Sequence, residues 1–206
     1  HVAVLEEVYG EGSRTVPGLV VDGEPVHGST AIMERLEQLA PDAHALYPQP
    51  IAGKVREAEL WGDREFQDHG RVLSWGALYF RPEMIGLLGG GGPLDPAGTD
   101  FAIRLVRGTW RHHGITCIRI AEHLAALPGH LDHIDSLIAD GVLGDPGHPN
   151  AADLQIGATM AVLRIIGDLR PLIEGRPCDA LADLLPERAG PIPAGAFPAD
   201  WVPAAA

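Results

Sequence analysis

The 206-residue sequence predicts an α+β protein in which a small β-containing region precedes an all-helical domain. Two β-rich runs lie near the start of the chain, separated by the pair Asp22-Gly23, which is a strong hairpin signal. From about residue 50 to residue 185, apolar residues instead recur mostly three or four apart, which is the spacing of a helix face. A capping pattern at Asn150 then precedes a run that is apolar nearly all round, as in a helix at the centre of a bundle.

The first residues read as β structure. We expect a short strand over Val2–Leu5 that ends at the polar pair Glu6-Glu7. A second strand is expected over residues 16–21 and a returning strand over residues 25–27, on either side of the Asp22-Gly23 turn. Together these strands should form part of a mixed sheet.

A helix is expected to follow the returning strand. Ser29 suits its cap, because a serine hydroxyl accepts hydrogen bonds from the free N–H groups of a first turn. The apolar residues beyond it recur at helical spacing, at Ile32, Met33, Leu36 and Leu39. Pro41 then ends the helix.

Pro17 stands at the start of the second strand, where its missing N–H does least harm. Two interpretations of the Val16–Pro17 step are open. It is either an edge proline with an ordinary trans bond, or a cis X–Pro bond that holds the backbone of Val16 open for pairing with a ligand. The sequence does not show the isomer.

Residues 16–32 read Val-Pro-Gly-Leu-Val-Val-Asp-Gly-Glu-Pro-Val-His-Gly-Ser-Thr-Ala-Ile. This run resembles the second half of the N-terminal domain of glutathione S-transferases. That family has a valine–cis-proline step, a hairpin, and then an acidic or amide residue followed by serine, another residue, alanine and isoleucine. Leu46-Tyr47-Pro48 is similar to the family's exit into the interdomain linker, and the capped helix at Asn150 is similar to a buried helix of the family.

The resemblance implies two domains. Residues 1–46 would form a thioredoxin-like glutathione-binding domain that lacks its first βα unit, and residues 50–206 an all-helical domain with an extended tail. Val16 and Pro17 would present backbone to the cysteinyl part of glutathione, and Ser29 would bind the γ-glutamyl carboxylate. Helix N-termini favour anions in general, because their N–H groups are free. The acidic or amide residue that would meet the γ-glutamyl amine is Gly28 here, which leaves only backbone at that position.

The implied function is that of a glutathione transferase, which conjugates glutathione to a small electrophilic substrate or otherwise uses it. No catalytic residue is assigned, because the strand and helix that carry the family's catalytic tyrosine, serine or cysteine have no counterpart here. The alternative is a non-catalytic binding or dimerisation module of the same fold. The resemblance also implies a homodimer, paired across the helix after Ser29 and the first long helix. Aromatic residues on that helix fit this expectation, at Trp61, Phe66, Trp75, Tyr79 and Phe80.

The helical region should begin with one long helix that ends near Arg81-Pro82. A second helix is expected from a cap at Thr99 to a break at Pro128-Gly129, with one apolar seam along its length. A third segment should run from Leu131 to Ile138. Asn150 and Asp153 form a capping pair before the buried helix.

Composition narrows the function classes. The net charge is −13, which repels phosphate backbones and disfavours nucleic-acid binding. No apolar run approaches the roughly 18 residues that span a bilayer, so no membrane association is expected. The run Gly89–Gly92 lacks the lysine and serine or threonine of a phosphate-binding loop and reads as a connector.

The histidines and cysteines carry no recognised motif. Histidines gather at residues 112–133, beside Asp132 and Asp135, but neither a cysteine pair nor a His-Glu-x-x-His motif is present, so no metal site is predicted. Cys117 lies on the expected apolar seam, where a buried thiol is inert packing. Two cysteines without a short-spaced motif favour a reduced, cytoplasmic location.

Overall fold

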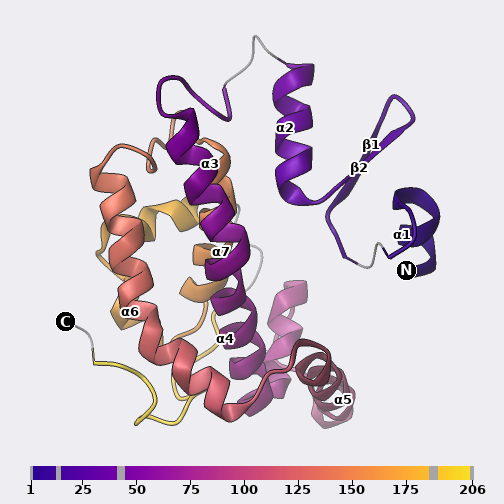
Figure 1. Cartoon of the computed structure of the whole chain (residues 1–206). Coiled ribbons are helices and arrows are strands. Elements are labelled where there is room, and N and C mark those ends of the chain that lie inside the picture. Colours follow the sequence, from indigo (N-terminus) through magenta and orange to yellow (C-terminus); the bar gives the residue numbers. More distant parts are fainter. Residues whose placement is uncertain (1, 13–14, 41–44, 186–189, 205–206) are drawn as a thin grey trace.

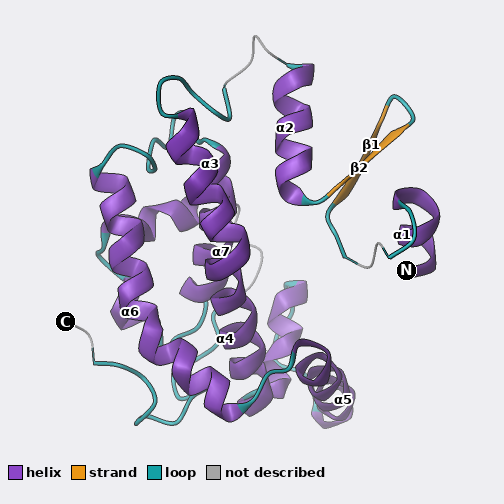
Figure 2. Cartoon of the chain, viewed as in Figure 1, coloured by secondary structure: helices purple, strands orange, loops and turns teal. Residues whose placement is uncertain are grey.

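The computed structural model of the chain describes residues 2–12, 15–40, 45–185 and 190–204. It divides into a small N-terminal part, at the right of Figure 1, and a larger helical part. Figure 2 shows that the strands belong to the N-terminal part and that the larger part is built of helices and loops. The α+β class is therefore confirmed. The sheet of the described residues is a two-stranded antiparallel hairpin, so the expectation of a mixed sheet was wrong for them.

The hairpin follows the local sequence signals. Strands β1 (Gly18–Val21) and β2 (Glu24–His27) pair with Gly18 opposite His27 and Val21 opposite Glu24. Asp22 and Gly23 both have positive φ, at 53° and 83°, as a two-residue hairpin turn requires. The expected hairpin is confirmed, and helix α2 (Ser29–Leu39) follows it directly.

The strand expected at Val2–Leu5 is wrong, because helix α1 (Val2–Tyr9) occupies this segment. Leu5 and Tyr9 are four residues apart and so share one helix face. Leu5 is buried, and the ring of Tyr9 lies against Gly18 of β1. A Cβ added at residue 18 would lie 2.3 Å from the Cζ atom of Tyr9. Packing on the hairpin therefore favours the helix over an added strand.

The long helix expected up to Arg81 is confirmed, with one irregularity. It consists of α3 (Ala52–Trp61), a π-helical turn (Gly62–Phe66) and α4 (Gln67–Phe80). In a π turn, residues five apart lie over one another. The rings of Trp61 and Phe66 stack in this way, with centroids 5.3 Å apart and an interplanar angle of 11°.

The single helix expected from Thr99 to Pro128 is wrong at both ends and is interrupted in the middle. After a 3-10 helix (Pro82–Gly89), helix α5 (Pro96–His113) begins with Asp95 as its cap rather than Thr99. The chain then breaks at Gly114, which has a left-handed conformation, and α6 (Cys117–Ala139) starts from a new cap at Thr116. The apolar seam expected along one helix is thus divided between α5 and α6.

Pro128 lies inside α6 instead of ending it, so the segment expected at Leu131–Ile138 is part of the same helix. An interior proline costs a helix about 3 kcal/mol. Fully buried side chains on both sides of Pro128 offset this cost, at about 1.5–3 kcal/mol each: Leu124, Leu127, Leu131 and Ile134. Tertiary packing therefore overrides the local break.

Helix α7 (Ala151–Arg164) is the central helix that the sequence predicts. It contacts α3, α4 and the 3-10 helix Pro177–Leu184, and most of its residues are buried. Asn150 and Asp153 form the expected capping box: Asn150 Oδ1 accepts from the N–H of Asp153 at 3.1 Å, and Asp153 Oδ2 accepts from the N–H of Asn150 at 3.0 Å. Asp153 Oδ1 also accepts from the N–H of Gly144 at 2.8 Å.

The C-terminal segment closes the core. After α8 (Arg170–Ile173) and the 3-10 helix, the described tail buries Ile192, Ala196 and Phe197. The N–H of Ile192 donates to the carbonyl of Ile165 at 2.7 Å. The described tail is therefore packed into the helical part rather than laid across its surface as an extended tail. Among the described helices, none combines the length and apolar character needed to cross a bilayer.

Polar contacts join the two parts. Glu34 of α2 pairs with Arg56 of α3 at 2.5 Å, and the Arg56 guanidinium lies over the ring of Tyr47. The Tyr47 hydroxyl donates to buried Glu59 at 2.8 Å, and the pKa of Tyr47 is raised by burial and by this bond. The linker at Tyr47 is thus built into the helical core.

Removal of the Asp153 carboxylate should destabilise the protein strongly. Asp153→Ala would leave the N–H groups of Asn150 and Gly144 without an acceptor, at about 1–3 kcal/mol each. Asp95→Ala, at the exposed cap of α5, is the matched control and should cost only about 1 kcal/mol. Urea denaturation followed by circular dichroism measures both values. Equal losses for the two variants would contradict the central role of the α7 capping box.

Candidate functional site

The four residues assigned from the sequence meet at one end of the hairpin. The N–H of Gly28 donates to the carbonyl of Pro17 at 3.0 Å, which extends the β1–β2 pairing to these residues. Val16 therefore lies beside the start of α2, where Ser29 is the first helical residue. The Val16–Pro17 bond is cis, and the Val16 side chain is 74% exposed.

Ser29 does not cap α2 as expected. Gly28 is the N-cap, and among the described residues no side chain accepts from the first-turn N–H groups. The first helical bond runs from the N–H of Ile32 to the carbonyl of Gly28, at 3.0 Å. The N–H groups of residues 29–31 are thus available to an anion, where the helix dipole is positive.

Gly28 has φ 95° and ψ 147°, a combination that residues with a side chain rarely adopt. The backbone conformation accounts for a glycine at this position. An added Cβ would meet nothing within 4 Å, so the space beside Gly28 is open. The site can therefore receive a ligand there, with backbone contacts only.

Two further residues shape this site, and the sequence did not single them out. His27 Nε2 lies 2.8 Å from the carbonyl oxygen of Thr15, which fixes the segment leading to Val16. The ring of Tyr9 stacks on His27, with centroids 5.4 Å apart, and packs against Gly18. The sequence signal for this contact is the glycine at residue 18, because the absence of a side chain there leaves room for the Tyr9 ring.

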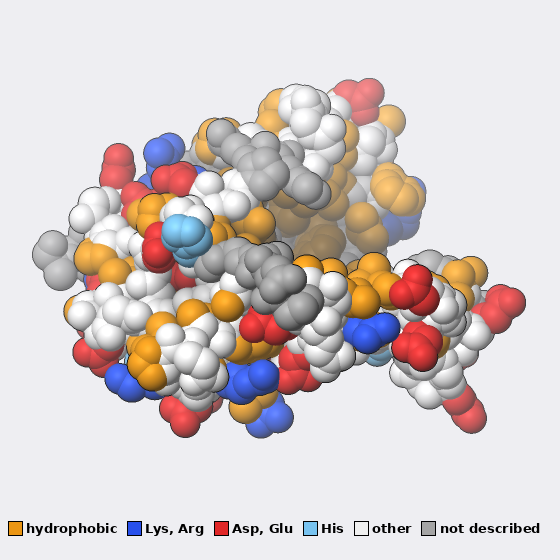
Figure 3. Space-filling view, turned by 90° about the horizontal axis from the view of Figure 1, so that it is seen from above, with side chains coloured by type: hydrophobic (Ala, Val, Ile, Leu, Met, Phe, Trp, Pro, Cys, Tyr) orange, Lys and Arg blue, Asp and Glu red, His pale blue; other side chains and the backbone are white. Residues whose placement is uncertain are grey.

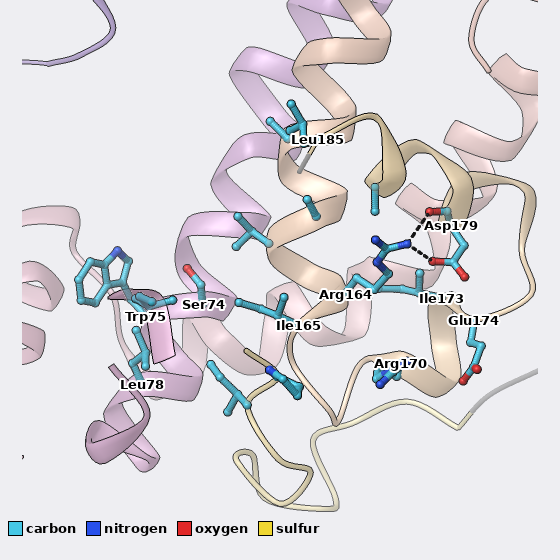
Figure 4. A pocket seen from close by; sticks show the side chains of 17 residues that line it. Ser74, Trp75, Leu78, Arg164, Ile165, Arg170, Ile173, Glu174, Asp179 and Leu185 are labelled. Carbon is cyan, nitrogen blue, oxygen red and sulfur yellow. Dashed lines mark hydrogen bonds and ion pairs between the residues drawn. The ribbon is translucent and has the colours of Figure 1, made fainter. Parts of the chain in front are cut away.

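The helical part contains a cavity of about 790 Å³. Its walls come from α4, α7, α8, the following 3-10 helix and the tail (Figure 4), and Leu88 of the 3-10 helix Pro82–Gly89 also lines it. Most of the lining is apolar and includes Trp75, Leu78, Ile165, Ile173 and Ile192. Its volume suits a small organic molecule.

The charged groups of the cavity are partly paired. Arg164 points towards Asp179, as Figure 4 shows, and its guanidinium lies 2.6 Å from Asp183. Partial burial lowers the pKa of Arg164, but the bonds to Asp183 and Asp179 outweigh this and raise it. Arg170 and Glu174 also line the cavity.

Figure 3 shows a hollow between the N-terminal lobe and the rest of the molecule, with hydrophobic side chains at its floor. Apolar residues are also exposed on the N-terminal part itself, at Val4, Val8, Val16 and Val20.

The cysteines have different environments. Cys178 is buried, and burial raises the pKa of its thiol to about 12, so this thiol stays protonated. Cys117 is exposed at the start of α6, which corrects the expectation of a buried seam position. The break at Gly114 changes the face that residue 117 presents.

Among the described residues, no group of three histidine, cysteine or acidic side chains has the geometry to hold a metal ion. Asp132 and Asp135, which neighbour the histidines in sequence, both pair with Arg176. The contact from Arg176 Nε to Asp135 Oδ2 is 2.9 Å.

Comparisons with known proteins give no match: no family model, curated protein or solved structure is significantly similar to this chain. The resemblance to glutathione transferases therefore depends on the residues quoted from the sequence.

A side chain at residue 28 should destabilise the N-terminal part. Gly28→Ala places a Cβ on a backbone with φ 95°, at a cost of about 1–3 kcal/mol. Gly53→Ala, in a helix with open space around it, is the control and should be neutral or stabilise by up to about 1 kcal/mol. Hydrogen exchange in residues 18–27 reports the effect locally. Unchanged exchange in Gly28→Ala would contradict the backbone constraint.

Proposed function

We propose that this chain is a glutathione-transferase-like protein that binds glutathione at Val16, Pro17, Gly28 and Ser29 and uses it on a small electrophile. The juxtaposition of the Val16 segment with the uncapped start of α2 carries this proposal. An extended peptide with a carboxylate at one end matches such a site, because one end pairs with backbone and the other meets free N–H groups.

The proposed roles follow from the groups present. The γ-glutamyl carboxylate accepts hydrogen bonds from the first turn of α2 and from the Ser29 hydroxyl. The Val16 backbone, which makes no hydrogen bond to any described residue, pairs with the cysteinyl part. The bound thiol loses a proton, and its sulfur forms a bond to the electrophilic carbon while the leaving group departs. No residue of this chain is assigned to activate the thiol.

The electrophile is proposed to be small and largely apolar. The cavity of about 790 Å³ and the hollow of Figure 3 are both lined by hydrophobic side chains, which support this class. We place the protein in the cytoplasm as part of the same proposal, since Cys117 and Cys178 are both free.

Loss of the Ser29 hydroxyl should weaken glutathione binding without loss of stability. A hydrogen bond to a charged group contributes about 1.5–3 kcal/mol, so Ser29→Ala should lower affinity about tenfold to a hundredfold. Because Ser29 makes no capping bond, the melting temperature should stay close to that of the wild type. Calorimetric titration with glutathione and melting curves measure the two effects.

Thr109→Ala is the matched control, since the Thr109 hydroxyl donates to the carbonyl of Leu105 within α5 and has no other partner among the described residues. Its affinity for glutathione should equal that of the wild type. Equal affinity in wild type and Ser29→Ala would remove Ser29 from the site. Absence of binding to the wild type at millimolar glutathione would favour a non-catalytic dimerisation module instead.

The second candidate function is a non-catalytic module that forms homodimers. It is favoured by α2, which has no buried residue and leaves Leu36 and Leu39 nearly half exposed. Leu60 on α3 is exposed to a similar degree. The aromatic residues first considered for the interface lie largely in contacts within the chain: Trp61 on Phe66, Tyr79 on Trp110, and Phe80 beside Phe197 and Trp201.

Charges on the exposed face of α2 should prevent dimerisation. Leu36→Glu combined with Leu39→Glu would bury two charges in the proposed interface, so the variant should sediment as a 21.9 kDa monomer. Phe101→Glu, on the exposed face of α5, is the control and should leave the dimer intact. Sedimentation velocity at micromolar concentration separates these results. A monomeric wild type would exclude the homodimer.

A further inference from the structure

Three imidazole rings meet between α4 and α6. The ring centroid of His69 on α4 lies 4.2 Å from that of His123 and 4.1 Å from that of His130, both on α6. His69 is 7% exposed, and the ring of Phe66 lies 6.4 Å from it on the same helix. Residues far apart in the sequence therefore form one compact cluster, which we call the imidazole cluster.

The imidazole cluster is poorly satisfied in hydrogen bonds. The Nδ1 atoms of His69 and His123 are both buried, and neither has a partner among the described residues. Buried polar atoms without partners are rare in folded proteins, because each costs free energy. The cluster therefore depends on ring packing between α4 and α6.

Charged and titratable groups face the cluster from every neighbouring element. They are Glu65 on the π turn, Asp68 on α4, and Arg119, Glu122 and His133 on α6. Asp68 Oδ2 lies 3.6 Å from His123 Nε2. Its carboxylate already pairs with Arg119 and, at 3.0 Å, with Arg71.

Protonation of these rings is therefore disfavoured in the folded chain. Burial lowers the pKa of His69, and the neighbouring rings of His123 and His130 also lower it, so that together they bring it to about 3. Burial also lowers the pKa of His123 and of His130, although Asp68 and Glu65 partly oppose it. Two charged rings about 4 Å apart would repel each other strongly away from water.

We propose that the imidazole cluster is an acid-sensitive latch, which holds α4 against α6 while its three rings are neutral and releases them when the rings take up protons. This inference is independent of glutathione binding. It gives the helical part a conformational response to acid, because histidine is the side chain whose charge ordinarily changes between pH 5 and 8.

The direction of the pH dependence follows from the lowered pKa values. Each ring binds its proton more readily in the unfolded chain, where the ordinary value is 6.5. The stabilisation is fully present above about pH 6.5 and is lost as the pH falls towards the folded-state values. The unfolding equilibrium constant should rise up to about tenfold per pH unit for each ring that stays neutral in the folded chain.

The first test compares urea denaturation at pH 7.5 and pH 5.5, with EDTA present, for the wild type and His69→Leu. Leucine fills a similar space and cannot take a proton, so the rise in the unfolding constant should shrink about tenfold. His148→Gln, at an exposed histidine, is the control and should behave as the wild type. The same pH dependence in His69→Leu as in the wild type would overturn the proposal.

Two measurements on the wild type keep the test independent of variant folding. In histidine NMR spectra, the His69 ring should show no titration between pH 8 and pH 5 while the chain stays folded; an ordinary midpoint near 6.5 would refute the latch. Hydrogen-exchange protection at pH 5.5 should fall first in residues 120–131 of α6. Equal loss across α7 would mean global unfolding rather than release of a latch.

Discussion

The start of α7 is the constraint on which the arrangement of the whole chain depends. Asp153 is completely buried, and burial raises the pKa of its carboxyl group. The free-energy cost of burying this carboxylate is offset by hydrogen bonds from the N–H groups of Asn150 and Gly144. These bonds also hold the loop after α6 in place. The N–H of Ala151 donates to the carbonyl of Leu46 at 3.0 Å, so the same helix end also fixes the linker. The capped end of α7 thus positions the central helix, the loop before it and the exit of the N-terminal part.

The sequence predicts those elements whose signals are local. The Asp22-Gly23 turn requires positive φ at both residues, and the capping box sets the start of α7 within four residues, so both were predicted correctly. The errors arise where packing decides. Val2–Tyr9 suits a strand or a helix until Tyr9 packs on the hairpin, and Pro128 stays helical because buried leucines hold both flanks of α6. The seam expected through residue 117 failed because apolar spacing continues across the break at Gly114.

The functional residues likewise fall into those that local sequence predicts and those that only packing brings together. Val16, Pro17, Gly28 and Ser29 belong to one hairpin and the helix after it, so a short stretch of sequence brings them together. The cavity of the helical part brings α4 and Leu88 together with residues 158–192, and no local pattern marks it. The imidazole cluster likewise joins α4 to α6 through side chains that the sequence shows only as scattered histidines. Such sites depend on tertiary packing, which periodicity alone does not specify.

The π turn at Gly62–Phe66 makes the long helix tolerant of a change in length at one place. A π turn accommodates one residue more than an α-helical turn, so the two flanking helices keep their faces despite the additional residue. A chain shorter by one residue within this turn would form a continuous α-helix with Glu59 and His69 still directed as they are here. A deletion elsewhere in α3 or α4 would rotate one face against the other by about 100° and separate the core residues from their partners. Natural variation in the length of this helix should therefore be concentrated at residues 62–66.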